Sequence, residues 1–527
     1  MTINIIEALT AIGTAELPGE NTPDPGDFEI TKCDIEHGSG ARYPIGGLIK
    51  ELHLYEDIEK IGITGWLQLE DNANLIQSGV IIGEELLWLK FSTAGAEDAG
   101  QDQFAIDFTK HPLYIHKVEG IEPTTTEQAG GASQSFITYR LHFCSTDMVS
   151  NSRIRISKNY QGRIDDIVTK ILEKDLQTKK PVEATNTIGL YNYTAPNIHP
   201  FDAVLQLTSR AQCKIGEPVR GPQDAKCVNN FKYDNHDYLF FETSTRKHSF
   251  DGGFFFIPLQ RSLDFGQDDL ILTLNNSQTT SGGEETPGSP KYPGFVNRML
   301  RTKSFDFTEN GDKWGTVEGG IWAAKHIRHN STKKSYSIYE HDYLEHLGDP
   351  TVSEISKTPV YWPKGGAKTI SEYSDARILY SSSSSKNRSE LFTGTGADAA
   401  YPWSHPTPAS TLTRNMQLGH ILGYQRVTCE LWGNSGLQIG KQLITEFPAV
   451  GLASGTPAQT GLEASKEVWP DRNNNVWMIT KLGHHMESKG GGFLADDSQD
   501  PVYTTSVEMV NTFAATEKVL PAYGGLG

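Results

Sequence analysis

The residues best suited to chemistry in this chain form a short histidine-rich segment towards its C-terminal end. His484, His485 and Glu487 lie together in MITKLGHHME, and imidazole with carboxylate is a frequent zinc-binding set. On a strand, successive side chains point to opposite faces, so His485 and Glu487 share a face while His484 points away. Two ligands do not hold zinc, and we predict a surface or interface pair, with no metal and no cofactor.

Pairs of neighbouring acids are the second candidate, because two suitably separated carboxylates catalyse the hydrolysis of glycosidic bonds. Adjacent residues of one strand or helix point in different directions, so the two acids of a pair are not expected to converge on one substrate. The pair in the first turn of a predicted helix has another role, since negative charge there favours the helix dipole. The three pairs are Glu84/Glu85, Asp165/Asp166 and Asp268/Asp269.

Motifs for a nucleophile or a phosphate loop are incomplete. Gly394, Gly396 and Ala397 resemble the start of a phosphate loop, but no Lys-Ser/Thr ending follows, which predicts a plain loop. No GxSxG elbow is present, and GNSG at 433–436 is typical of a turn between two strands. No catalytic residue is therefore nominated, and the chain is predicted not to be an enzyme.

Tryptophans could bind carbohydrate at a flat aromatic platform. Those in question lie in segments whose apolar and polar residues alternate, which favours packing in a core or at a subunit contact. They are Trp66, Trp88, Trp432 and Trp477. A glycan-binding or glycan-degrading protein remains an alternative, to be tested by retention on envelope polysaccharide and by cleavage of it.

The segments that carry many of these residues occur twice. GVIIGEEL and GLQIGKQL share one spacing, and each is followed by a strand-like segment, LYIHKVEG or MITKLGHH, and then by ITYRLHFCST or YTTSVEMVNT. Matches in the same order at both ends of the chain indicate one β unit built twice. The positions expected to be equivalent are Gly79 and Gly436, Ile82 and Ile439, Gly83 and Gly440, Leu86 and Leu443, Ile115 and Ile479, and Leu141 and Val507.

Composition and charge restrict the classes of function. The chain has 527 residues, more than one hydrophobic core usually supports, and its 51 Gly and 26 Pro predict a loop-rich, strand-rich protein. With 65 acidic and 47 basic residues the net charge is -18, which disfavours sequence-specific DNA binding. Ordinary solubility accounts for such a charge, and so does an inner wall past which DNA slides without sticking.

Cysteines and apolar runs give no sign of secretion or of a membrane anchor. Five scattered cysteines without a CxxC pair indicate neither a disulfide framework nor a zinc site, and fit a reducing compartment. The first twenty residues lack the basic start of a secretory signal. No run approaches the roughly 18 apolar residues of a membrane span.

We expect a mainly β, multidomain chain with an α+β insertion. Alternation of period two fills the first block, and amphipathic patterns in RIDDIVTKILEKDL and NIHPFDAVLQLTSRAQ predict two helices. The expected order is an N-terminal arm (1–25), a first β domain (26–150), an α+β domain (151–274), a linker (275–294), the first part of a second β domain (295–344), an inserted polar domain (345–410), the remainder of the second β domain (411–515) and a C-terminal tail (516–527).

The two β blocks resemble the tube-like domains of the baseplate hub proteins of contractile-tailed bacteriophages. LYEDIEKIGITGWLQLEDNANLIQSGVIIGEELLWLKF looks like the first such domain, and RNMQLGHILGYQRVTCELWGNSGLQIGKQLITEFP, with WMITKLGHHME and YTTSVEMVNTF, is similar to the second. The helical segments between them resemble the inserted α+β domain of that family. The resemblance covers about residues 26–515 and rests on strand patterning, without an invariant motif.

The resemblance implies a structural homotrimer with two β-barrel or β-sandwich domains of the tail-tube fold in each chain. Six such domains would form a pseudo-sixfold ring that joins a hexameric tail tube to a trimeric central spike and lines the DNA channel. The expected partners are further copies of the chain, the tail tube protein and the spike protein, followed by tape measure and wedge or other baseplate proteins. The expected location is the virion tail baseplate, after assembly in the host cytoplasm.

Three segments depart from the simplest pattern of that family: the N-terminal arm, the linker and the polar region 345–410. They leave the domain boundaries open and would contact other baseplate proteins. The paired β domains also resemble the hub part of type VI secretion spike proteins, which usually continue into a β-helical needle. This chain stops at Gly527, soon after its second β block, which favours the phage interpretation.

Overall fold

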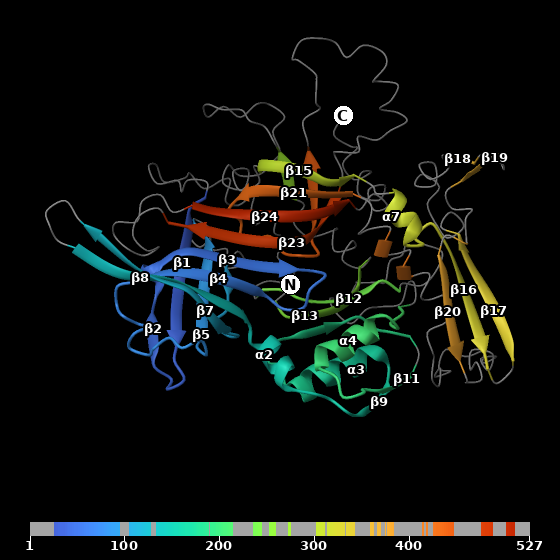
Figure 1. Ribbon diagram of the computed structural model, residues 1–527, viewed down its shortest axis with the longest axis horizontal. Coiled ribbons are helices and arrows are strands. Elements are labelled where there is room, and N and C mark those ends of the chain that lie inside the picture. The colour runs from blue at the N-terminus through green and yellow to red at the C-terminus, as the bar shows by residue number, and fades with distance from the viewer. Residues whose placement is uncertain are drawn as a thin grey trace, which may run out of the picture.

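A computed structural model shows two β units, an α+β domain and a smaller separate sheet (Figure 1). The residues that the structure describes are 26–94, 105–127, 133–188, 190–213, 236–244, 252–259, 272–275, 302–310, 313–331, 334–342, 359–362, 366–369, 375, 377–383, 414–415, 418–419, 425–446, 476–488 and 502–511.

The first β unit is an antiparallel sheet whose strands alternate between buried apolar and exposed polar residues. Leu52 and Leu54 of one strand and Leu67 of the next are fully buried, while the residues between them are not. The strands are β1 (Phe28–Glu36), β2 (Arg42–Pro44), β3 (Ile49–Asp57), β4 (Thr64–Asp71), β5 (Leu86–Thr93), β6 (Ile106–Asp107), β7 (Leu113–Glu127) and β8 (Ser133–Ser145), with a 3₁₀ turn at Gly46–Leu48. They follow the spatial order β3-β4-β8-β7-β5-β1-β2, with β6 beside β5.

The α+β domain follows directly. Its helices are α2 (Thr146–Arg153), α3 (Ile164–Lys170), which continues as a π-helical segment at Ile171–Leu176, and α4 (Pro200–Thr208). Its strands are β9 (Asn159–Gly162) paired with β11 (Tyr191–Thr194), and β10 (Val182–Ala184), β13 (Phe254–Pro258) and β12 (Tyr238–Glu242) in one sheet. Both helices predicted from the amphipathic patterns are present, α4 with Pro200 in its first turn.

The strand FFFIP of β13 is apolar throughout because both of its faces are covered. Phe254 and Phe256 belong to the core formed with the helices, whereas Phe255 and Ile257 belong to the core of the second β unit. This small sheet therefore lies between the helices and the second unit, as Figure 1 shows for β12 and β13.

The second β unit continues the sheet of the first. Its strands are β14 (Leu272–Asn275), β15 (Thr302–Asn310), β21 (Gln425–Trp432), β22 (Gln442–Glu446), β23 (Val476–Glu487) and β24 (Val502–Asn511). Together the two units form one 14-stranded sheet, in which eleven strands follow the order β15-β21-β24-β23-β3-β4-β8-β7-β5-β1-β2 and β6, β14 and β22 pair off this path. In Figure 1 the orange and red β23 and β24 lie beside the blue β3 and β4.

Strand pairing differs from the expected organisation at two places. β14, at the end of the segment expected to belong to the α+β domain, pairs in parallel with β22 of the second unit. β16 (Ala323–Asn330) and β17 (Ser335–Asp342), expected in the second β domain, instead form a separate sheet with β20 (Ile378–Ser383). β20 lies in the segment expected to be an inserted polar domain, and it pairs in parallel with β16 through backbone hydrogen bonds.

The remaining described elements are α7 (Lys313–Glu318) and the hairpin β18 (Pro359–Trp362) and β19 (Gly366–Thr369). The prediction of a mainly β, multidomain fold with an α+β portion is confirmed. Among the described cysteines, Cys33, Cys144 and Cys429 are free and buried, whereas Cys213 is disulfide-bonded, which the scattered spacing did not indicate.

Close packing at Gly65 of β4 gives a direct test of this sheet. A Cβ added there would lie 2.2 Å from the carbonyl oxygen of His53 and 2.5 Å from the Phe143 ring. We expect Gly65→Ala to lower the free energy of unfolding by about 1–3 kcal/mol. The matched control is Gly47→Ala, whose added Cβ meets no atom within 4 Å. Equal denaturation midpoints for the two variants would contradict the packing described.

Candidate functional site

The feature on which a function can be built is the seam where the two β units join. Seven residue pairs, from Lys481 opposite Asp57 to Glu487 opposite Glu51, connect β23 to β3 in antiparallel register. Backbone hydrogen bonds close the ladder at both ends, from Ile58 N–H to the Thr480 carbonyl (2.9 Å) and from Ser488 N–H to the Lys50 carbonyl (2.9 Å). One edge strand of each unit is thereby paired and removed from solvent.

Side chains reinforce the seam at a second point. Ser435 Oγ lies 2.9 Å from the Thr93 N–H and 3.0 Å from Thr93 Oγ1, and the Thr93 hydroxyl also reaches the Gly433 carbonyl at 3.2 Å. Ser435 is fully buried, so GNSG is turn chemistry, as predicted, and supplies no nucleophile. Its role in joining the units could not be read from the sequence.

The strands on either side of the seam have the same arrangement. In the first unit β3, β4, β8 and β7 are neighbours in that order, and in the second β15, β21, β24 and β23 are neighbours in that order. The registers agree as well, since Leu67 faces Leu141 where Cys429 faces Val507. The two four-stranded segments therefore share topology and pairing, although their sequences differ.

Two irregularities of each segment fall at matching places. The matching register shifts lie between Ile115 and Lys117 in β7 and Ile479 and Lys481 in β23, and between Ile49 and Glu51 in β3 and Thr302 and Ser304 in β15. Each segment has a third shift without a counterpart, between Glu119 and Glu122 in β7 and between Asp306 and Glu309 in β15. Because a bulge bends a strand and increases its twist locally, matching bulges give the two segments the same curvature.

The structure places the predicted repeat positions unevenly. Ile115, Ile479, Leu141 and Val507 are all fully buried, and the first two stand immediately before the matching register shifts. Gly83 and Gly440 both have a left-handed backbone (φ +93° and +80°). Gly79 is also left-handed (φ +76°), whereas Gly436 is not, and Ile82 is 61% exposed where Ile439 is 4% exposed.

The equivalence of Leu86 and Leu443 needs a correction. Leu86 faces Tyr114, whereas the residue in the corresponding place of the second unit is Gln442, which faces Met478. Leu87, opposite Leu113, is the counterpart of Leu443, opposite Trp477. The first unit has one more residue than the second between the turn glycine and the paired strand residue. An alignment of the two units at constant spacing is therefore wrong by one position once it reaches the strand.

The histidines of the seam form a ring cluster. His485 Nδ1 lies 2.6 Å from His53 Nδ1 across the β23/β3 ladder, and His485 Nε2 lies 2.9 Å from Ser506 Oγ. His53 stacks on Trp66 with ring centroids 3.9 Å apart. This interface pair matches the prediction for His485, while His484 is buried on the other face beside the Tyr503 hydroxyl (2.7 Å).

Burial disfavours a charge on these rings. Desolvation, and then the nearby His485 and Arg140, lower the pKa of His53 to about 4, and desolvation also lowers the pKa of His485. Both rings are then neutral near pH 7, one nitrogen donating to the other. Among the described residues no cluster of three or more possible ligands could hold a metal ion.

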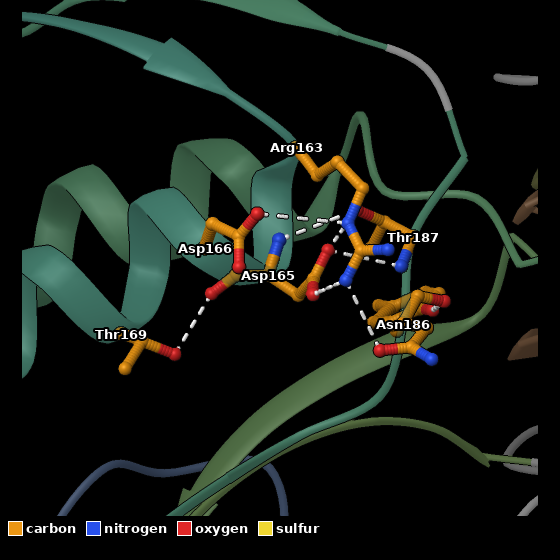
Figure 2. A network of polar contacts seen from close by, with 7 residues as sticks. Arg163, Asp165, Asp166, Thr169, Asn186 and Thr187 are labelled. Carbon is orange, nitrogen blue, oxygen red and sulfur yellow. Dashed lines mark hydrogen bonds and ion pairs between the residues drawn. The ribbon is translucent and has the colours of Figure 1, made fainter. Parts of the chain in front are cut away.

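The acid pairs are structural where the structure describes them. The Asp165 carboxylate is buried and accepts hydrogen bonds from the Thr187 N–H (3.1 Å) and hydroxyl (2.7 Å) and pairs with Arg163, which also reaches Asn186 (Figure 2). This network fixes the start of α3 to the loop before β11. Asp166, its neighbour, is 37% exposed at its side chain, and its carboxylate lies 3.6 Å from Arg163 Nε.

Glu85 has a similar role in the turn before β5. Its buried carboxylate accepts the N–H groups of Ile82 (2.6 Å), Gly83 (3.0 Å) and Glu84 (3.1 Å), so its acceptor sites are occupied by its own loop. Asp268 and Asp269, like Gly394, Gly396 and Ala397, lie outside the described residues.

The four tryptophans considered for a sugar platform are covered by a cation or buried. Arg140 lies over Trp66 (4.6 Å), Arg42 over Trp88 (3.9 Å) and Lys303 over Trp432 (4.7 Å). Trp477 is fully buried in the core of the second unit. A pocket of about 440 Å³ beside the seam, lined among others by Tyr55 and Met148, has its charges paired internally through Lys481 and Glu508 (2.9 Å).

No helix in the described part of the chain is both long and apolar enough to cross a membrane.

Replacing the two first-turn aspartates of α3 separately tests their roles. Asp165→Ala leaves the N–H and hydroxyl of the buried Thr187 without their acceptor and removes one partner of the half-buried Arg163, so we expect a loss of about 2–3 kcal/mol in the free energy of unfolding. Asp166→Ala, the control on the adjacent residue, should change it by no more than about 0.5 kcal/mol. Chemical denaturation measures both, and equal losses would contradict the network in Figure 2.

The seam histidines predict that the free energy of unfolding falls as the pH is lowered. A histidine whose folded pKa lies below its ordinary 6.5 contributes its full stability above pH 6.5 and loses it as the pH falls towards the folded pKa, which is about 4 for His53. Between pH 7 and 5 the wild type should lose about 2 kcal/mol more than a His53→Gln/His485→Gln variant. Parallel denaturation curves for the two proteins across this range would refute the assignment.

Comparisons with known proteins give structural neighbours only. No protein-family model matches the chain, and no curated protein matches it. The tail protein from Neisseria meningitidis MC58 has a TM-score of 0.44 and 9% identity, over 92% of this chain and 97% of that chain. The 43 kDa tail protein of prophage MuSo2 from Shewanella oneidensis has a TM-score of 0.40 and 10% identity, over 92% and 98%. A Francisella PdpA–VgrG complex has a TM-score of 0.38 and 10% identity, over 92% of this chain and 58% of that chain. The solved structures to which this chain is similar are thus tail proteins and a VgrG complex, at scores too low to support a functional conclusion.

Proposed function

We propose that this protein is a structural baseplate hub of a contractile phage tail, without enzymatic activity. The observation that carries the proposal is the pair of four-stranded segments with one topology, one register and matching bulges, joined edge to edge within a single chain. Such an arrangement supplies two copies of one building block per chain. The resemblance of the sequence to the hub family suggests what role two copies in one chain would have.

Duplication solves a problem of symmetry. A homotrimer of this chain carries six β units, so its upper face can present six similar edges to a hexameric tail tube. The same trimer retains a threefold face for a trimeric central spike. Because the two units of a chain differ in sequence, the ring is sixfold only in its backbone, as a pseudo-sixfold adaptor requires.

The exposed face of the continuous sheet is suited to line a channel. Several of its acids are paired with bases: Lys50 with Glu70 (3.0 Å), Lys117 with Glu119 (2.8 Å), Lys303 with Glu430 (3.1 Å), and both Lys481 and Arg426 with Glu508 (2.9 Å each). A wall with paired charges offers DNA phosphates few free cations to bind. In the proposed ring DNA passes along this face without being held, within a chain of net charge -18.

The partners follow from the geometry of the ring. The tail tube protein would stack on one face, the central spike protein on the other, and the α+β domain, which packs outside the sheet core, would face tape measure, wedge or other baseplate proteins. The proposed location is the tail baseplate of the virion, assembled in the host cytoplasm.

The oligomer tests this function. Sedimentation of the purified chain should give the mass of three chains, and cryo-electron microscopy along the particle axis should show six similar β units in threefold particles. Added tail tube protein should extend the particle as a hexameric tube. A chain that stays monomeric at high concentration and does not cap the tube would refute the proposal.

A further inference from the structure

The small sheet β17-β16-β20 carries an exposed apolar surface. Of the large apolar side chains that are exposed in the described part of the chain, four lie on this sheet: Tyr336 (71% exposed), Ile338 (50%), Ile378 (52%) and Tyr380 (68%). Figure 1 shows the sheet apart from the large 14-stranded sheet, next to α7. Because exposed apolar patches on a protein surface commonly mark interaction sites, this sheet is a candidate for binding a ligand.

Strand pairing places these four side chains on one face. Ile338 of β17 is paired with Ile327 of β16, and Ile327 is paired with Tyr380 of β20, so the three point to the same side of the sheet. Tyr336 stands two positions from Ile338, and Ile378 two positions from Tyr380, so alternation keeps them on that side. The face therefore presents two tyrosine rings and two isoleucines together.

The opposite face of β16 is covered. Ala324 and His326, which alternate with Lys325 and Ile327, are only 2% and 7% exposed. The solvent side of a half-covered sheet is normally polar, so packing within the chain does not account for apolar residues there.

Two carboxylates are fixed at one end of the exposed face. Lys325, which shares this face with Ile327, contacts Glu340 Oε1 (3.0 Å) and Asp375 Oδ1 (2.7 Å). Only 19% of the Lys325 side chain is exposed, against 59% for Glu340 and 76% for Asp375. Hydrogen bonds to these two acids raise the pKa of Lys325, so its ammonium stays charged and holds both carboxylates in place. Lys325 contacts one oxygen of each carboxylate, which leaves the second oxygen to accept a hydrogen bond from a ligand.

The size of the face restricts the ligand. Strands lie about 4.8 Å apart and residues of one face about 6.7 Å apart along a strand, so three strands with three such residues each span roughly 10 Å by 13 Å. A stable protein interface needs about 800 Å² on each partner, several times this area. A face of this size suits a ligand of a few rings in a row better than a folded protein.

Charge restricts the ligand further. Lys325, Glu340 and Asp375 give the face one base and two acids, within a chain of net charge -18. This balance repels polyanions such as nucleic acid, and also anionic lipid surfaces. The complementary ligand is uncharged and carries hydroxyl groups that can donate to carboxylates.

We propose that this face binds a neutral polysaccharide. A sugar ring has one side of C–H groups, which packs on the rings of Tyr336 and Tyr380, and a rim of hydroxyl groups, which donate to Glu340 and Asp375. The site is separate from the four tryptophans considered above, which are covered by a cation or buried. The inference goes beyond the proposed hub function and does not depend on it.

Retention on immobilised polysaccharides tests the proposal, because a polymer that binds several molecules at once makes a weak contact detectable. Full-length protein should be retained on at least one neutral polysaccharide in a panel of purified bacterial polysaccharides, and not on the anionic ones. Tyr336→Ala/Tyr380→Ala should lower the affinity about tenfold or more, since the rings on which the sugar packs are lost. Tyr55→Ala, at an exposed tyrosine of the large sheet, is the matched control and should leave the affinity unchanged.

The exposure of the two tyrosines separates binding from folding. Both side chains are more than two thirds exposed, so the double variant should keep the denaturation midpoint of the wild type. A second variant, Glu340→Gln/Asp375→Asn, keeps the shape of the side chains and removes their charge. It should bind the neutral polysaccharide several-fold more weakly, because hydrogen bonds to a charged acceptor are stronger. An unchanged affinity in this variant would overturn the role given to the carboxylates.

Three results would overturn the proposal as a whole: no retention on any neutral polysaccharide, retention that the tyrosine variant does not reduce, or retention on anionic polymers alone. A protein that binds through the same tyrosines while every polysaccharide fails would also overturn it. The hub function is unaffected by these results, since it is decided by the mass of the oligomer and by the ring.

Discussion

Unpaired backbone groups at a strand edge must find partners, and in this protein that requirement governs how the parts are joined. A β unit that ended at β23 would leave N–H and C=O groups exposed over seven positions, and so would a unit that began at β3. Pairing the two edges satisfies both at once and makes one sheet of two units. The side-chain contacts of the seam, such as Thr93 with Ser435 and His53 with His485, are additions to this backbone ladder.

Buried polar contacts stabilise the α+β domain internally and also join it to the first β unit. Lys180 is buried between Asp147 of α2 (3.2 Å) and Glu242 of β12, so the chain segment leaving β8 is tied to the small sheet. Removing one partner of such a group would leave a buried charge uncompensated. On the other side, Ser244 N–H donates to Glu56 of β3 (3.2 Å), which anchors the same sheet near the seam.

Much of the fold follows from local rules that a sequence displays. Alternation predicts β4, and the helical period predicts α3 with Asp165 in its first turn, because each depends on residues near one another in the chain. The counterparts Ile115 and Ile479 could be found because both are buried beside a bulge, where the choice of residue is restricted. The one-residue offset at Leu86 could not be predicted, because an added residue in a turn does not change the pattern of apolar and polar residues in the strand that follows.

Pairing between strands that lie far apart in the sequence could not be predicted, for a different reason. The parallel pairing of β14 with β22, and of β20 with β16, is made by backbone groups that every residue carries. The seam itself is of this kind, since no sequence motif in β3 or β23 predicts that these two strands pair. Only His485 gave a hint, as a polar residue expected at an interface, and its partner His53 was not identified from the sequence.

The location of the seam within one chain has a kinetic consequence. Two strands on one polypeptide meet at an effective concentration set by the chain that connects them, commonly on the order of millimolar, whereas separate chains meet at their bulk concentration. The internal ladder therefore forms first and at any expression level, and the curvature that it imposes is already present when a second chain arrives. In the proposed trimer a ring of two-unit chains needs only three contacts between chains, whereas a ring of single units would need six, so fewer assembly steps can leave the ring incomplete.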